Sequence, residues 1–506
     1  MKSTMNFLCC LLTTLILATF TSCSSDSDSS GSSKPNIEFY GLNTAGNALV
    51  KYNANNSGNA ISTTAITGLQ PSEILLGIDF RPATGELYGL GSTSRLYTIS
   101  TFNGMATPVS LTAFPIVLTS ASLAGFDFNP TVDRIRVVTS TGINFRLNPD
   151  TGVLVATDTN LNPGSPSIAA AAYNNNTALA TATSLYVIDS STGTLYLQNP
   201  PNNGVLVSVG SLGITGTITG NGGFDIDAED GTAIASLTVD GMNHLYQVDL
   251  TTGAATDLGM LETSISGLAI PTAPSAFAVD ASNNLILFNP NTPGTSKIVA
   301  ITGLQVSETI VGLDIRPATG QLYGLGSTGR VYILGTAGTA TMVGTGPAQA
   351  LSGTEFGFDF NPLVDRIRVV SNTGQNFRIN PNDGTLIGTG DIALSPGTPN
   401  ISAVAYSNNY VGTTTTVLFY IDAATDTLYS SSNPNGGILS SVGTLGVDVT
   451  AGSGFDIGGA TDTAYALLTV GGNNGIYTIN KTSGSATLLV AFPAGNIKAF
   501  AVGLGN

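Results

Sequence analysis

Short β-rich runs separated by turn residues recur along almost the whole chain. One stretch shows the pattern plainly, with four such runs at 224–227, 232–239, 244–250 and 254–258. Runs of this length bounded by turn residues predict a four-stranded antiparallel unit. Triplets ending in glycine lie between such runs, at 83–85, 150–152, 191–193, 251–253 and 318–320. Glycine suits these hairpin positions because they need a positive φ. The sequence predicts no amphipathic helix after the N-terminal segment.

The β-rich runs are organised with a regular period. In the first part of the chain, the strands that open each unit begin near Gly77, Gly125, Ala170, Gly223 and Gly267, which are 44 to 53 residues apart. A period of about 40–50 residues is typical of β-propeller blades. The sequence therefore predicts an all-β propeller built from four-stranded blades.

A longer repeat divides the chain into two halves. The segment 77–93 recurs at 312–328, and the segment 125–138 recurs at 357–370, at offsets of 235 and 232 residues. We therefore expect propeller repeat 1 at residues 37–270 and propeller repeat 2 at residues 271–506.

The ends of each half predict how it closes. Residues 265–270 fit the innermost strand of a blade whose other strands lie at 37–42, 48–53 and 60–67, and residues 497–502 would complete the blade that begins at Ala276. Pairing the terminal strands removes exposed sheet edges and gives five blades per half. The alternative is one ten-bladed ring, because the linker 271–276 is as short as an ordinary loop within a blade.

Composition restricts the chemistry. Charged residues are 9% of the chain and 61 residues are glycine, as expected for a turn-rich extracellular β protein. The net charge of −16 repels phosphate backbones, so nucleic acid is not an expected partner. The only histidine is His244, and the three cysteines are Cys9, Cys10 and Cys23, which excludes thiol catalysis, disulfides and cysteine zinc sites in the body of the protein.

The N-terminus has the pattern of an export signal. Lys2 precedes an apolar stretch at 7–20, which is too short to span a bilayer. The segment 1–22 resembles a bacterial lipoprotein signal, although Phe20 stands where leucine is usual, and this resemblance implies that Cys23 is lipidated and becomes the mature N-terminus. Residues 23–36 are then a flexible Ser/Asp-rich tether, and the lipid is the only membrane anchor. An ordinary signal peptide with an incidental cysteine is the alternative.

Two sequence blocks carry a family resemblance. They are Gly-Ile-Asp-Phe-Arg-Pro-Ala-Thr-Gly-Glu-Leu-Tyr-Gly, from Gly77, and Phe-Asp-Phe-Asn-Pro-Thr-Val-Asp-Arg-Ile-Arg-Val-Val, from Phe126. Both recur in the second half, and they resemble the bacterial secreted family called domain of unknown function 4394. The resemblance implies a β-propeller and an exported location at the outer membrane or cell surface, and it brings no catalytic residues.

The most informative polar positions are aspartates on the predicted innermost strands: Asp79, Asp127, Asp225, Asp314, Asp359 and Asp456. Side-chain alternation places them on the face toward the axis, so three carboxylates would gather in each half. Crowded carboxylates raise one another's pKa and attract a hard cation, so one interpretation is a Ca²⁺ site. The other is structural, with each aspartate bound to backbone amides or to arginines such as Arg81, Arg134 and Arg136.

Three other features of the sequence carry candidate polar chemistry. Residues 225–231 have a faint similarity to a calcium loop but fit an acidic hairpin turn better, and His244 has no histidine or cysteine partner in the sequence. Arg146 and Arg378 stand between apolar residues in both halves. They are expected to pair with Asp133 and Asp365, or else to hold a carboxylated ligand in bidentate fashion.

These observations favour a non-catalytic binding or scaffolding protein of the cell envelope. Its partner would be a protein or glycan at the cell surface, and no cofactor is required apart from the Ca²⁺ option. The alternatives are a Ca²⁺-dependent hydrolase or lactonase, in which axial carboxylates hold the metal, and a structural surface spacer.

Overall fold

Antiparallel β-sheets make up almost all of the regular structure in the computed structural model, which describes residues 34–119 and 124–506. The strands in these residues form ten sheets, nine of four strands and one of three. The helical segments among them are single 3-10 turns, at Ala54–Asn56, Pro201–Asn203 and Pro434–Gly436. No helix in the described part of the chain is both long and apolar enough to cross a membrane. The predicted all-β class is confirmed.

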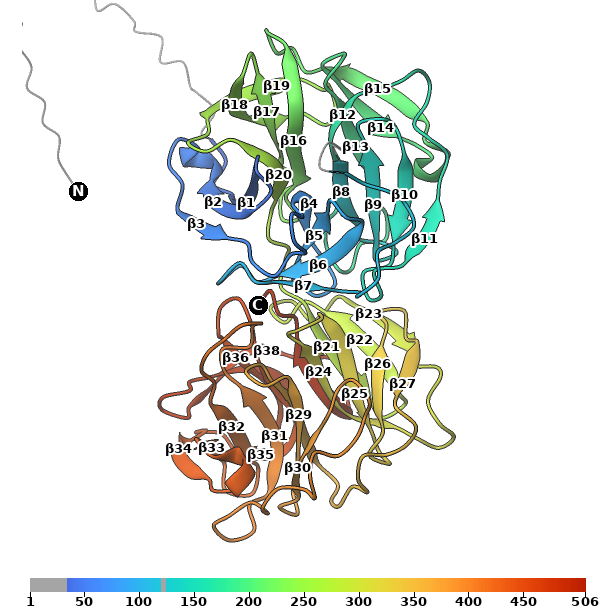
Figure 1. The fold of residues 1–506 in the computed structure, drawn as a ribbon. Helices are drawn as coiled ribbons and strands as arrows, with labels where there is room; N and C mark the ends of the chain where they lie inside the picture. Colours follow the sequence, from blue (N-terminus) through green and yellow to red (C-terminus); the bar gives the residue numbers. More distant parts are fainter. Residues whose placement is uncertain (1–33, 120–123) are drawn as a thin grey trace, which may run out of the picture. The chain divides into compact units, whose positions relative to one another are not determined.

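Five sheets belong to the first half (Figure 1, blue to green). In chain order their strands are β1 Glu38–Asn43, β2 Ala48–Asn53, β3 Ser62–Ala65, β4 Leu75–Phe80, β5 Leu87–Gly91, β6 Arg95–Ile99, β7 Ala106–Pro108, β8 Ala124–Asn129, β9 Arg134–Thr139, β10 Asn144–Leu147, β11 Leu154–Thr157, β12 Ile168–Tyr173, β13 Leu185–Asp189, β14 Thr194–Gln198, β15 Leu206–Ser211, β16 Ile218–Ile226, β17 Ala233–Val239, β18 Met242–Val248, β19 Ala255–Met260 and β20 Ile265–Ala269.

The other five sheets belong to the second half (Figure 1, yellow to red). Their strands are β21 Ala276–Asp280, β22 Asn284–Phe288, β23 Ser296–Ala300, β24 Ile310–Arg316, β25 Gln321–Gly326, β26 Val331–Leu334, β27 Ala340–Val343, β28 Phe356–Asn361, β29 Arg366–Ser371, β30 Asn376–Ile379, β31 Ile401–Tyr406, β32 Leu418–Asp422, β33 Thr427–Ser431, β34 Ser440–Thr444, β35 Val449–Ile457, β36 Ala464–Val470, β37 Asn473–Ile479, β38 Ala486–Ala491 and β39 Ile497–Val502.

One sheet in each half combines strands from its two ends, as predicted. β20 pairs antiparallel with β1, with Leu268 opposite Gly41, and the sheet order is β20-β1-β2-β3. In the second half β39 pairs with β21, with Ala501 opposite Phe277. Each half therefore completes its own sheet instead of borrowing a strand from the other.

The first strands of successive sheets contact one another in closed cycles. We call these the central strands: β4, β8, β12, β16 and β20 in the first half, and β24, β28, β31, β35 and β39 in the second. Each contacts the next in that order, β20 returns to β4, and β39 returns to β24. The contacts thus form two cycles of five, and the single cycle of ten sheets is not observed.

Glycine allows the central strands to approach closely. A Cβ added to Gly223 would lie 2.3 Å from the Leu268 backbone nitrogen, and one added to Gly125 would lie 2.6 Å from the Ala171 Cβ. Both distances are far below van der Waals contact, so these two positions require glycine.

The hydrophobic core lies between neighbouring sheets. Leu76 and Tyr88 of one sheet pack with Phe128 and Val137 of the next in a single buried cluster. The Tyr88 and Phe128 rings meet edge to face at 5.2 Å, and Tyr323 and Phe360 repeat this contact at 5.1 Å in the second half. Each sheet is therefore stabilised by burial against its neighbours.

Candidate functional site

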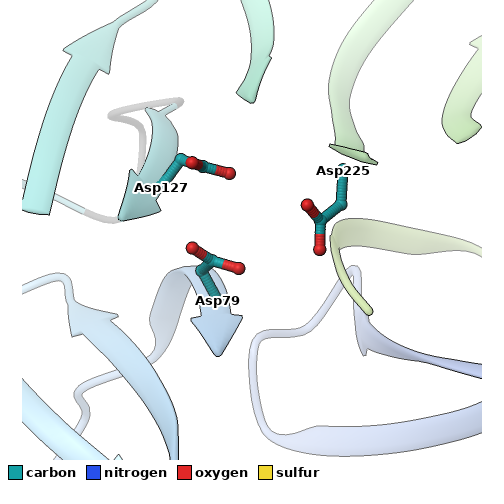
Figure 2. Close-up of side chains that lie close together, drawn as sticks. All are labelled: Asp79, Asp127 and Asp225. Atoms are coloured by element: carbon teal, nitrogen blue, oxygen red, sulfur yellow. The ribbon is translucent and has the colours of Figure 1, made fainter. Parts of the chain in front are cut away.

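Three of the five central strands in each half carry one of the predicted aspartates. Asp79, Asp127 and Asp225 lie on β4, β8 and β16, and each is at most 1% exposed. Figure 2 shows their carboxylates pointing toward one another, and one oxygen from each lies within 4.8 Å of the other two. Asp314, Asp359 and Asp456 form the same arrangement in the second half. The prediction that three carboxylates gather in each half is confirmed, and we call each group a carboxylate triad.

Backbone amides donate hydrogen bonds to these carboxylates. Asp79 Oδ1 accepts from the Phe80 amide, and its Oδ2 accepts from the Phe128 amide on the neighbouring central strand, both at 2.8 Å. The remaining bonds in this half run to Asp127 Oδ1 from the Tyr173 amide at 3.0 Å, to Asp225 Oδ1 from the Ile226 amide at 2.6 Å, and to Asp225 Oδ2 from the Ile270 amide at 2.6 Å. Three carboxylates thus accept hydrogen bonds from five amides, one on or directly after each of the five central strands.

The second half repeats this network bond for bond. Its five amides belong to Ile315, Phe360, Tyr406, Ile457 and Val502. Because three carboxylates have six oxygens and five amides donate, one oxygen is left over. It is Asp359 Oδ2, which is buried and has no hydrogen-bond partner. The equivalent residue of the first half is Asp127, whose Oδ1 accepts the Tyr173 amide.

The triad aspartates bind backbone amides, as one of the two structural predictions stated. The other prediction, that they pair with arginines, is wrong. Arg81 contacts Asp133 and Asp150, and Arg136 contacts Asp158. Within residues 34–119 and 124–506, no ion pair reaches any of the six triad aspartates. The arginines bind carboxylates outside the triads, whereas the three aspartates of a triad face one another.

Burial and mutual repulsion raise the pKa of the triad carboxyls. Burial, followed by the charge of Asp225, holds the pKa of Asp79 well above its usual range, and burial with the charges of Asp79 and Asp225 does the same for Asp127. Burial raises the pKa of Asp225 to about 7 against the opposing effect of its two amide donors. The second half behaves in the same way at Asp314, Asp359 and Asp456.

A second site surrounds the predicted arginine Arg146. Its Nε and Nη2 bind Asp158 at 2.8 and 2.9 Å, and Arg136 shares the same carboxylate. Arg378 and Arg368 bind Asp391 in the same way. The predicted partners Asp133 and Asp365 are therefore wrong, because those residues bind Arg81 and Arg316. Asp158 and Asp391 were missed, although the two copies place these aspartates 12 and 13 residues after the arginine.

A cavity of about 370 Å³ opens beside these arginines in the first half. Its lining includes Arg134, Arg136, Arg146, Tyr173 and Asn202. Arg134 donates to the Asp133 carbonyl at 2.7 Å and forms no ion pair with another described residue. Arg136 and Arg146 share the carboxylate of Asp158, and Arg134 brings a third guanidinium group to the cavity. The lining holds three arginines and no acidic side chain, in a protein of net charge −16. We call this the arginine cavity.

The remaining sequence candidates take no part in either site. Residues 227–231 form the turn between β16 and β17, as predicted, with the Gly231 amide donating to the Asp227 carbonyl. His244 on β18 lies 3.0 Å from Asp257 and belongs to neither ligand cluster found in the described residues.

A buried glutamate distinguishes the two halves. Glu86 borders a cavity of about 110 Å³ that residues of both halves line, and its Oε1 has no hydrogen-bond partner. Burial raises the pKa of Glu86 to about 7, against a hydrogen bond from Thr84. Gln321 stands at the matching position of the second copy. Aligning the two copies would have singled out this residue, which sequence reasoning missed.

These features define a duplicated all-β protein with one buried carboxylate triad in each half. The chain belongs to the family described as "Domain of unknown function (DUF4394)", whose model matches residues 48–269 and 284–501 in two tandem copies. No curated protein matches the chain. A solved structure, a protein of unknown function from Bacteroides caccae, is similar at 12% identity and a TM-score of 0.28 over 61% of this chain and 93% of that one. A TM-score this low supports no argument about fold or function.

Proposed function

We propose that each half is a five-bladed β-propeller and that the chain is a non-catalytic binding module of the cell envelope. Three observations support the propeller arrangement: the sheets of nearly uniform size, the two closed cycles of central strands, and the strands from both ends that complete one sheet in each half. Export follows from the N-terminal pattern, and Cys23, which lies outside the described residues, would carry the lipid anchor at the outer membrane.

The arginine cavity is the observation that carries the binding function. Guanidinium groups recognise carboxylates through paired N–H donors, and Tyr173 and Pro200 add flat apolar surface to the same cavity. A volume of about 370 Å³ accommodates a small group such as one or two acidic sugar units. We propose that its ligand is a carboxylate-bearing glycan of the cell surface.

The two alternative functions have weaker support. A Ca²⁺-dependent hydrolase would need its substrate to touch the triad, yet all six carboxylates are at most 1% exposed. A structural spacer does not account for a cavity lined by three arginines and no acidic side chain.

Binding of an acidic glycan tests the proposed ligand. Oligogalacturonate should bind the full chain in a calorimetric titration, whereas the neutral galactose oligomer should not. Arg134→Gln should weaken binding about 10- to 100-fold, because a charge-assisted hydrogen bond contributes about 1.5–3 kcal/mol. Arg95→Gln, at an arginine outside the cavity that donates to Thr93, is the matched control. Equal affinity for the acidic and neutral oligomers would refute an arginine-based site.

Cell fractionation tests the anchored location. Cys23→Ser should move the protein from the membrane to the soluble fraction or leave its signal uncleaved, because the acyl chains supply the hydrophobic attachment. Cys10→Ser is the control, since it lies within the predicted signal. Unchanged processing and membrane association of Cys23→Ser would contradict the lipoprotein assignment.

A further inference from the structure

Each carboxylate triad has more acceptor capacity than its backbone donors use. Five amides occupy five of the six oxygens, and in the second half the sixth, Asp359 Oδ2, is buried within the triad without a donor. A buried carboxylate oxygen without a hydrogen-bond partner destabilises the folded state, because it has lost its hydrogen bonds to water and forms none within the protein. The hydrogen bonds of the fold therefore leave one carboxylate oxygen of this triad without a donor.

The charge of the triad is also uncompensated by side chains. The three carboxylates lie within 4.8 Å of one another, and the described arginines and lysines form their ion pairs elsewhere. Amide donors stabilise the ionised form of Asp79 and Asp225 but bring no net positive charge. Three like charges in a buried space require neutralisation by a proton or by a cation.

We propose that each triad binds one Ca²⁺ ion, which Asp79, Asp127 and Asp225 ligate in the first half and Asp314, Asp359 and Asp456 in the second. The ion would hold three of the five central strands together at the centre of each cycle. This site is independent of the arginine cavity and of the glycan proposed to occupy it.

The donor set identifies the type of metal. All six ligands are carboxylates, the hard oxygen donors that Ca²⁺ and Mg²⁺ prefer, and neither triad contains histidine or cysteine. Mg²⁺ usually keeps several waters and is held by one or two carboxylates, whereas Ca²⁺ takes six to eight oxygen ligands in a flexible geometry. One oxygen from each of three carboxylates lies within 4.8 Å of the other two, and a site with three carboxylates favours Ca²⁺.

In each half the central strands enclose a small cavity of about 10 Å³. It is lined by residues that directly precede triad aspartates, such as Ile78, Phe126 and Phe224, and not by the triad carboxylates themselves. This volume holds about one water molecule. Calcium takes six to eight oxygen ligands, so water and second carboxylate oxygens would complete its coordination.

Metal content of conservative variants tests the proposal. Asp359→Asn keeps the Oδ1 acceptor for the Tyr406 amide and replaces the unpartnered oxygen by an uncharged amide group. Elemental analysis of the full chain after dialysis should find about two Ca²⁺ per chain, about one in Asp359→Asn and about none in Asp127→Asn combined with Asp359→Asn. Asp230→Asn, at an exposed turn acid of the calcium-like segment, is the control and should keep the full content.

Thermal melting supplies the second readout. A ligand that binds only the folded state raises the melting temperature, so calcium should raise it after chelator treatment, and the double asparagine variant should lose this response. A parent protein without stoichiometric metal, whose melting is the same in calcium and chelator, would overturn the proposal and show that protons neutralise the triads. Calcium binding that persists unchanged in the double variant would also overturn it, because the ion would then lie elsewhere.

Discussion

Asp79→Ala is expected to lower the free energy of unfolding by about 2–6 kcal/mol, roughly twice the loss expected for Asp127→Ala. Each buried amide left without an acceptor costs about 1–3 kcal/mol. Asp79 accepts from the Phe80 and Phe128 amides, whereas the hydrogen bond to Asp127 comes from the Tyr173 amide alone. The ratio of the two losses therefore measures how many amides each carboxylate satisfies.

Urea denaturation in excess chelator measures both losses without any contribution from bound metal. Glu229→Ala, at an exposed residue of the β16–β17 turn, is the control and should stay within about 0.5 kcal/mol of the parent protein. Asp314→Ala and Asp359→Ala should reproduce the same order in the second half, because the network is repeated there. Equal losses for Asp79→Ala and Asp127→Ala would show that the amide bonds do not determine the stability.

Asp158→Ala is expected to destabilise the first half by about 3–5 kcal/mol, because removing one partner of a buried ion pair leaves an uncompensated charge. Asp158 binds both Arg136 and Arg146, and the side chains of Arg136 and Asp158 are only 3% and 6% exposed. The variant also leaves three arginines around the arginine cavity with no carboxylate among them.

Acetate provides the decisive measurement for this variant. If the cavity admits carboxylates, millimolar acetate should raise the melting temperature of Asp158→Ala but leave that of the parent protein nearly unchanged, since added carboxylate replaces the missing one. Asp257→Ala is the control, because it removes a half-exposed acid beside His244. Either of two results would contradict a selective carboxylate site. One is a loss of unfolding free energy below about 1 kcal/mol, and the other is equal stabilisation of the variant by chloride and by acetate.

Much of the fold follows from local sequence. The turn triplets and the β-rich runs predict β17 and β18 to within two residues, because hairpin pairing depends on residues close together in the chain. Alternation along a strand places Phe126 and Phe128 on the core side and Asp127 on the other. The duplication is visible without any structure, and the two matches to the family model agree with it.

The partners of the polar side chains were less predictable. An aspartate beside arginine-rich segments could accept from a guanidinium or from an amide, and the sequence contains both donors. Asp79 meets the Phe128 amide 49 residues away, and Arg146 meets Asp158 instead of Asp133. These choices depend on which strands adjoin and on which way each side chain faces after the sheets pack.

The sequence by itself determined the all-β class, the duplication, the strands that close each half and the six aspartates that face inward, because period-two alternation and turn chemistry act over a few residues. Only the tertiary structure decided that the central strands form two cycles of five, that amides rather than arginines hold the aspartates, and that Arg136 and Arg146 share Asp158. The physical reason is that a short linker such as 271–276 permits either closure, and a carboxylate accepts from any nearby donor. The packing of sheets that are distant in the chain determines which closure forms and which donor each carboxylate accepts from.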